Sequence, residues 1–185
     1  MLSIHSWVCQ PQIAVRNIMS QSDDYPLLHA TRIDIPLEIR TYVTTILNQT
    51  LACTVDLRSQ VKQAAWNVKG IACIPLHVLF DTIAVELDAY TELLAERITV
   101  LGGVVRGTIR MAATHSTIPE YPDDIVEGNA HVHALAERFA DYAKALRSCI
   151  AHAADVEDAD TANVYTDISR GIDKRLSLME AHLYQ

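Results

Sequence analysis

The sequence is poor in residues that interrupt helices or cross-link small folds. Its 185 residues include only 6 Gly, 6 Pro and 4 Cys, and 6% are aromatic. The cysteines form no CxxC pair and no dense framework, which excludes a disulfide scaffold and leaves them as expected small buried residues. The scarcity of Gly and Pro argues against a β architecture, which needs many turns. Apolar residues still make up 50% of the chain, so long aliphatic helices are expected.

Long apolar runs and basic charge are also scarce. The sequence contains no run of about 18 apolar residues, the length needed to span a bilayer. Its N-terminus lacks the basic segment followed by an apolar segment that is typical of a signal peptide. A soluble, cytoplasmic protein with no membrane partner is therefore expected. The 15 basic residues stand against 23 acidic ones, for a net charge of -8. This balance disfavours nucleic acid as a partner and favours cations.

Apolar periodicity predicts one all-α domain. Residues 1–35 show no sustained period and are interpreted as an N-terminal arm that is only partly ordered, followed by a domain over 36–185. Apolar residues then recur at steps of 3 and 4. They predict long helices over 36–72, 75–101 and 129–154, and a fourth that follows an acidic turn at 155–160 and reaches 183.

The connection between the second and third predicted helices is long. Residues 104–128 contain prolines and glycines, with a short helix expected around 123–126. Long connections in compact domains usually cross the fold or carry function. Four long helices with one such crossover describe a ferritin-like four-helix bundle.

Candidate metal ligands share one face of the second helix. His77 and Asp81 are four residues apart, and so are Glu92 and Glu96; at about 100° per residue, all four fall within a sector of roughly 100°. Eleven residues separate Asp81 from Glu92, about 16 Å along a helix, so one chain cannot bring both pairs onto one metal ion.

Two copies of this helix packed antiparallel about a two-fold axis would bring each pair against the other. Nitrogen and carboxylate ligands with open positions suit iron. The alternative is that the glutamates belong to a solvated acidic face and that His77 is an ordinary core or surface histidine. Spacing alone leaves both interpretations open.

Longer motifs resemble those of the Dps family of ferritin-like proteins, over most of residues 36–183. They are AWNVKG at 65–70, LHVLFD at 76–81, ELDAYTELLAERITVLGG at 86–103, IPEYP at 118–122 and DADTANVYTDISRGIDKRLSLMEAHL at 158–183. The resemblance implies a dodecameric shell. It would oxidise Fe(II), preferentially with hydrogen peroxide rather than oxygen, store ferric mineral and so limit oxidative stress.

The resemblance also implies roles for individual residues. His77 and Asp81 match the ligands from one subunit, and Glu92 and Glu96 match carboxylates from its partner. Trp66 matches a tryptophan beside the centre, where radical interception and core packing are equal alternatives. Iron is the implied metal, with zinc as a competing occupant.

One position departs from the family pattern. The usual HWN is AWN here, because Ala65 precedes Trp66. The missing imidazole is expected to weaken the second metal position and slow the ferroxidase reaction, unless Cys73, His5 or His29 supplies a substitute ligand. The alternative function is a shell that binds and stores metal with an impaired ferroxidase centre.

The resemblance places acidic residues at a three-fold pore near the start of the last helix. Asp158 and Asp167 match pore positions, Asp160 is close by, and Asn163 replaces a common Asp. The alternative is that these acids cap the helix, because a helix N-terminus favours negative charge.

Two further expectations concern the arm and the remaining histidines. Residues 1–35 contain no Lys and only Arg16 and Arg32 as basic residues. DNA binding depends on neutralising phosphates, so it is expected to be weak or absent. His131, His133 and His152 are interpreted as surface histidines.

Overall fold

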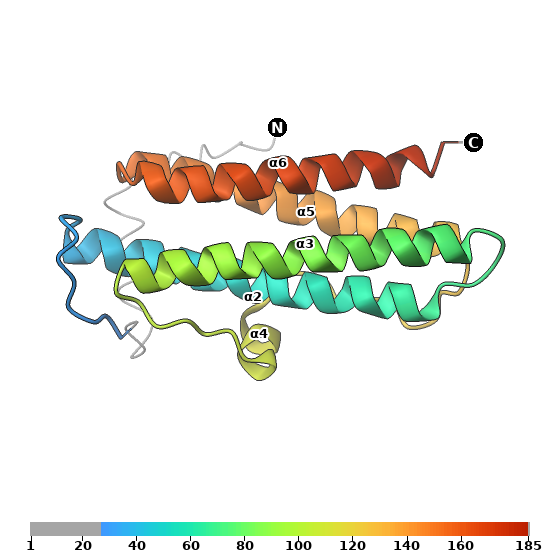
Figure 1. Ribbon diagram of the computed structural model, residues 1–185, viewed down its shortest axis with the longest axis horizontal. Coiled ribbons are helices and arrows are strands. Elements are labelled where there is room, and N and C mark those ends of the chain that lie inside the picture. The colour runs from blue at the N-terminus through green and yellow to red at the C-terminus, as the bar shows by residue number, and fades with distance from the viewer. Residues whose placement is uncertain (1–26, 185) are drawn as a thin grey trace, which may run out of the picture.

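The computed structural model describes residues 27–184, which form five helices and no strand. The long helices are α2 (Leu37–Asn67), α3 (Cys73–Val100), α5 (Gly128–Asp155) and α6 (Ala159–Ala181). They run side by side as a four-helix bundle (Figure 1), which confirms the predicted all-α fold with a long crossover between the second and third long helices. No described helix is long and apolar enough to cross a membrane.

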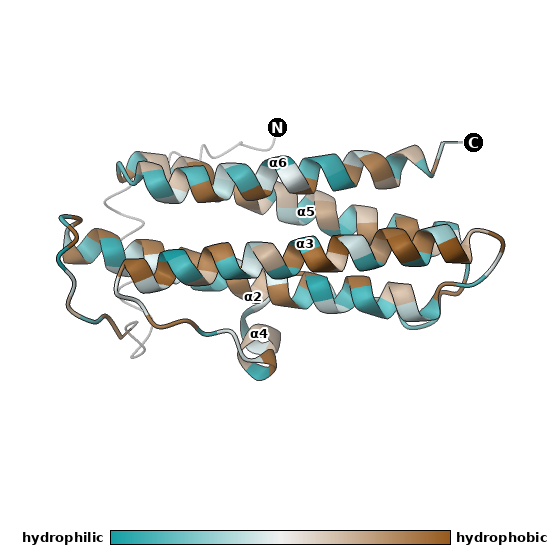
Figure 2. Cartoon of the chain, viewed as in Figure 1, coloured by the Kyte–Doolittle hydropathy of each residue, from teal (hydrophilic) through white to brown (hydrophobic). Residues whose placement is uncertain are grey.

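The predicted apolar stripes form the core. Figure 2 shows hydrophobic and hydrophilic bands alternating along the long helices, as expected where each helix buries one face. The hydroxyls of two buried tyrosines form hydrogen bonds with threonines of α2. Tyr142 Oη lies 2.6 Å from Thr54 Oγ1, and Tyr165 Oη lies 3.2 Å from Thr50 Oγ1. Among the cysteines expected to be buried, Cys53 is buried, whereas Cys73 and Cys149 are partly exposed.

The first turn between helices comes earlier than predicted. α2 ends at Asn67 rather than near residue 72, and Gly70 has a φ of +95°. A positive φ is readily adopted by glycine and ends the helical path. The Lys69 N–H donates to the Val126 carbonyl at 3.1 Å, which ties this turn to the end of the crossover. α3 then begins at Cys73, and Pro75 lies in its first turn, where a missing N–H is tolerated.

Part of the predicted arm lies against the end of α3. The His29 N–H donates to the Gly102 carbonyl at 2.7 Å. Gly102 has a φ of +83°, and a Cβ there would lie 2.6 Å from the His29 carbonyl oxygen. Arg40 adds a bond to the Leu101 carbonyl at 3.0 Å. The segment before α2 is thus fixed at this point, and residues 1–26, with His5, Arg16 and the rest of the predicted arm, lie outside the described residues.

The short helix predicted around 123–126 was wrong. The crossover instead forms α4 (Ile109–His115), where Thr108 Oγ1 accepts a hydrogen bond from the Met111 N–H at 3.4 Å and caps the helix. α4 packs against α2 on the side away from α5 and α6 (Figure 1).

The rest of the crossover is fixed by buried polar residues of α5. Arg138 donates to Gln60 Oε1 at 2.7 Å and to the Glu120 carbonyl. His131, which is 1% exposed, has its Nδ1 2.6 Å from Tyr121 Oη. The interpretation of His131 as a surface histidine was therefore wrong, whereas His133 and His152 are exposed.

Candidate metal centre

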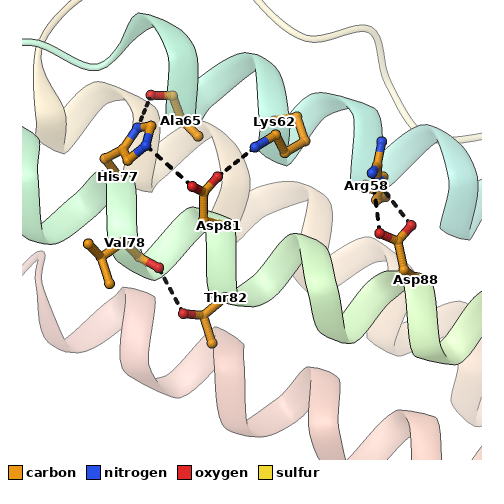
Figure 3. Close-up of polar contacts among 8 residues, drawn as sticks. All are labelled: Arg58, Lys62, Ala65, His77, Val78, Asp81, Thr82 and Asp88. Carbon is orange, nitrogen blue, oxygen red and sulfur yellow. Dashed lines mark hydrogen bonds and ion pairs between the residues drawn. The ribbon is translucent and has the colours of Figure 1, made fainter.

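His77 is oriented by a backbone carbonyl. Its Nδ1 lies 2.7 Å from the Ala65 carbonyl oxygen, at the end of α2. A carbonyl only accepts, so Nδ1 carries the proton and Nε2 of the neutral ring is free to bind a cation. Nε2 lies 3.3 Å from Asp81 Oδ2 (Figure 3). A ring held through its other nitrogen and set beside a carboxylate is the usual arrangement of a metal-binding histidine.

Asp81 already has a cation beside it. Lys62 Nζ, from α2, lies 2.7 Å from Asp81 Oδ1 (Figure 3). The hydrogen bond from Lys62 is the main reason that the pKa of Asp81 lies below its usual range. The same ammonium lies 5.6 Å from the ring centroid of Trp66, within reach of a cation–π attraction. Asp81 therefore stands ionised between His77 and Lys62.

Ala65 contributes to this site only through its backbone. Its side chain is in the core and the residue is 3% exposed, while its carbonyl oxygen holds His77. Trp66, the next residue, is 63% exposed. In this chain Trp66 is therefore a surface residue beside Lys62, which sets aside core packing within the single chain as the reason for an aromatic residue there.

Glu92 and Glu96 lie further along α3, both exposed to solvent. Within residues 27–184, neither side chain forms a hydrogen bond or an ion pair, and no cluster of three or more His, Cys, Asp or Glu residues could hold a metal ion. The structure brings His77 and Asp81 together but leaves the two glutamates apart from them. A centre that uses all four residues needs a second chain.

The bundle interior does not offer an alternative centre. Ferritin-like di-iron proteins place inward glutamates and Glu-x-x-His pairs in the bundle core. Here the buried polar residues of the described chain include a single carboxylate, Asp158, at the start of α6. The sequence contains no Glu-x-x-His. The candidate ligands of α3 thus lie outside the bundle core, on the outer face of that helix.

Asp158 is held within the chain as a helix cap. Its carboxylate accepts hydrogen bonds from the Thr161 N–H at 3.0 Å and the Thr161 hydroxyl at 2.7 Å, and Arg97 Nη2 lies 2.6 Å away. The side chains of Asp160 and Asp167 are 82% and 70% exposed. The capping alternative therefore accounts for Asp158, and the pore role of all three stays a prediction.

Sequence reasoning missed the basic residues of α2 beside the centre. Arg58, Lys62 and Trp66 recur at intervals of four, so they share one face of α2. Lys62 pairs with Asp81, and Arg58 Nε lies 3.0 Å from Asp88 Oδ1 (Figure 3). The interval of four was the signal that could have identified this row.

Comparison with known proteins agrees with this architecture. A ferritin-like domain matches residues 44–185. The DNA protection during starvation protein of Agrobacterium fabrum is 36% identical over 157 residues, which cover 85% of this chain and 97% of that protein. The protein of the same name from Brevibacillus brevis is 27% identical and covers 78% of this chain and 97% of its own length.

Solved structures give the same result. DpsC from Streptomyces coelicolor matches with a TM-score of 0.81 at 25% identity, over 85% of this chain and 92% of that one. A Dps protein from Bacillus brevis matches with a TM-score of 0.75, also at 25% identity, over 80% and 99% of the two chains. With a ferritin-like domain over most of its length and a relative 36% identical along nearly its whole length, this chain belongs to the Dps family of ferritin-like proteins.

Proposed function

We propose that this chain forms a homo-oligomeric shell, a dodecamer, which oxidises Fe(II) at sites shared between two subunits and stores the ferric product. The position of the ligands on α3 carries this proposal. The midpoint between His77 and Glu96 is also the midpoint between Asp81 and Glu92, and it falls between Glu86 and Leu87. One two-fold axis at that level therefore opposes both pairs at once.

The residues suit iron as a substrate. His77 Nε2 and the Asp81 carboxylate offer one nitrogen and one oxygen ligand side by side, and the partner subunit's Glu92 and Glu96 would supply two further carboxylates. Carboxylates stabilise Fe(III) more than Fe(II), because the added charge strengthens their attraction. Zn(II) accepts the same nitrogen and oxygen ligands and would compete.

The proposed reaction uses hydrogen peroxide as the preferred oxidant. Two Fe(II) ions give up one electron each, and one hydrogen peroxide takes both electrons and two protons to become two waters. No hydroxyl radical is released when both electrons are delivered together. The function would thus limit oxidative damage in the cytoplasm, which is the expected compartment.

Stopped-flow absorbance tests this proposal. Fe(II) is added anaerobically to metal-free protein and then mixed with hydrogen peroxide or oxygen, beside a protein-free blank. We expect fast peroxide-driven oxidation in the wild type and in His133→Ala, an exposed α5 histidine as matched control, and its loss in His77→Ala. A wild-type rate equal to the blank would refute the ferroxidase proposal.

A second function, metal storage with an impaired centre, is favoured by the alanine at position 65. We expect Ala65→His to speed oxidation, because an added imidazole supplies a ligand for the second ion. Ala65 is 3% exposed, so a larger side chain carries a packing cost, and Ala65→Leu is the matched control for size. An Ala65→His rate no faster than the wild type would show that this position does not limit the reaction.

Entry of iron and DNA binding complete the proposal. The exposed Asp160 and Asp167 are proposed to attract Fe(II) at a pore, with Asp158 fixed beside them by Arg97.

DNA binding is proposed to be weak or absent, because residues 1–35 contain no Lys. A clear gel shift at physiological salt would contradict this, and it would favour a DNA-compacting role.

A further inference from the structure

Next to the candidate metal centre, a second ion pair joins α2 to α3. Arg58 Nε lies 3.0 Å from Asp88 Oδ1, and Arg58 Nη2 lies 3.2 Å from Asp88 Oδ2 (Figure 3). The side chains are 43% and 56% exposed. Nε itself is buried, yet it is too poorly aligned with Asp88 to form a hydrogen bond. Arg58 Nη2 donates the one hydrogen bond of the pair to Asp88 Oδ2, charge attraction adds to it, and the guanidinium keeps other N–H groups to offer.

Asp88 lies on the same face of α3 as the four candidate ligands. At about 100° per residue it falls inside the sector that His77, Asp81, Glu92 and Glu96 span. It is also close to the proposed two-fold axis, which crosses α3 between Glu86 and Leu87. Two copies of Asp88 would then be only about 4.5 Å apart along the helix axis.

Two carboxylates this close in an interface repel each other unless cations accompany them. Arg58 is the cation in position to do so. The pair lines a hollow of about 310 Å³ between α2, α3 and α4, so neighbouring side chains of its own chain do not enclose it tightly. Val85, 68% exposed, lies on the other side of the same face. If a second copy of the chain covered Val85, water would be excluded there, and the interactions between Arg58 and Asp88 would become stronger.

We propose that Arg58 and Asp88 set the register of the two-fold interface, with each Arg58 binding Asp88 of both subunits in a cluster of alternating charges. The proposal rests on the proposed function for the position of the axis. A slip of one helical turn, about 5.4 Å, would separate this cluster and would also move His77 and Asp81 away from the opposing glutamates. Arg58 and Asp88 are thus positioning residues for a centre that they do not touch.

Subunit mixing with a charge-swapped variant tests the proposal. R58D/D88R keeps the pair within each chain but reverses its sign, so it should assemble with itself. Across an axis shared with the wild type, two arginines would face each other, and so would two aspartates. We expect dimers that contain one chain of each kind to fall at least tenfold below random mixing, as counted by native mass spectrometry after co-refolding.

The matched control is H133E/E137H, which swaps an exposed pair of α5 and should mix at random. Random mixing of R58D/D88R with the wild type would overturn the proposal, because it would confine the pairing to one chain. If R58D/D88R does not fold, Asp88→Asn decides: several-fold faster subunit exchange with the wild type supports the proposal, and an unchanged exchange rate overturns it. Failure of wild-type subunits to form any two-fold dimer would instead refute the proposed shared centre.

Discussion

At the residue scale, the candidate centre contains its own competitor for iron. Lys62 Nζ lies 2.7 Å from Asp81 Oδ1, on a carboxylate that also stands 3.3 Å from His77 Nε2. A metal ion that binds Asp81 must share the carboxylate with this ammonium or displace it. Because like charges repel, a second cation is opposed by the first bound cation as well as by Lys62. The centre is therefore expected to bind one ion more tightly than the other.

Removing this cation should strengthen iron binding. In Lys62→Met, the side-chain length is kept and the charge is lost, so Fe(II) affinity should rise by up to about fivefold, the range of a partly exposed ion pair. Anaerobic titration calorimetry measures the change, with Lys144→Met on the exposed face of α5 as control. Weaker binding in Lys62→Met than in Lys144→Met would mean that Lys62 supports the site rather than competes.

The residue scale also shows what spacing can predict. The i, i+4 interval placed His77 beside Asp81, because residues four apart share a helix face. It could not reveal that the Ala65 carbonyl orients His77, since every residue has a carbonyl. The same interval groups Lys62 with Arg58 on one face of α2, but it could not reveal the contact between Lys62 and Asp81. That contact depends on how α2 is rotated against α3, which is set by packing of the whole core.

At the element scale, Gly171 explains how α3 and α6 come close. A glycine inside a helix costs about 1 kcal/mol relative to alanine, so its presence in α6 needs a reason. A Cβ at this position would lie 1.8 Å from Tyr90 Oη of α3. Four residues along each helix, Arg175 Nε of α6 donates to Glu86 Oε2 of α3 at 2.6 Å. This hydrogen bond lowers the pKa of the Glu86 carboxyl. The gap left by Gly171 thus lets Tyr90 dock beside an ion pair between the same two helices.

Gly171→Ala should therefore destabilise the protein despite its better helix propensity. We expect a loss of about 1–3 kcal/mol in the free energy of unfolding, the usual result of overpacking. Urea unfolding followed by far-UV circular dichroism, at fixed protein concentration, measures it. Gly107→Ala is the control, because a Cβ there meets only ordinary contacts, at 3.5 and 3.6 Å.

Combining Gly171→Ala with Tyr90→Phe should recover part of the loss, since the hydroxyl that meets the new methyl group is removed. Equal stability of Gly171→Ala and the wild type would show that Tyr90 moves aside without cost.

The elements themselves were predictable to different degrees. The four long helices followed from apolar residues at intervals of 3 and 4, which reflect a buried face directly. The crossover did not, because α4 begins with a local cap at Thr108 and the segment after it is fixed by the buried Arg138. A single buried arginine leaves no periodic signal in the sequence.

At the scale of the whole molecule, the proposed centre would be divided between two chains. Each subunit would contribute His77 and Asp81 to one site and Glu92 and Glu96 to another. Two variants with opposite defects, His77→Ala and Glu92→Gln/Glu96→Gln, should each lose oxidation. In a mixed dimer, however, one of the two sites would receive intact halves from both chains.

Co-refolding equal amounts of the two inactive variants should therefore restore activity. Random pairing makes half of the dimers mixed, and each has one intact site of two, so about a quarter of the wild-type rate is expected. The rate is measured by stopped-flow absorbance with hydrogen peroxide, beside each variant refolded alone. If all the ligands came from one chain, every chain in the mixture would lack an essential half, and the mixture would be as inactive as its parts.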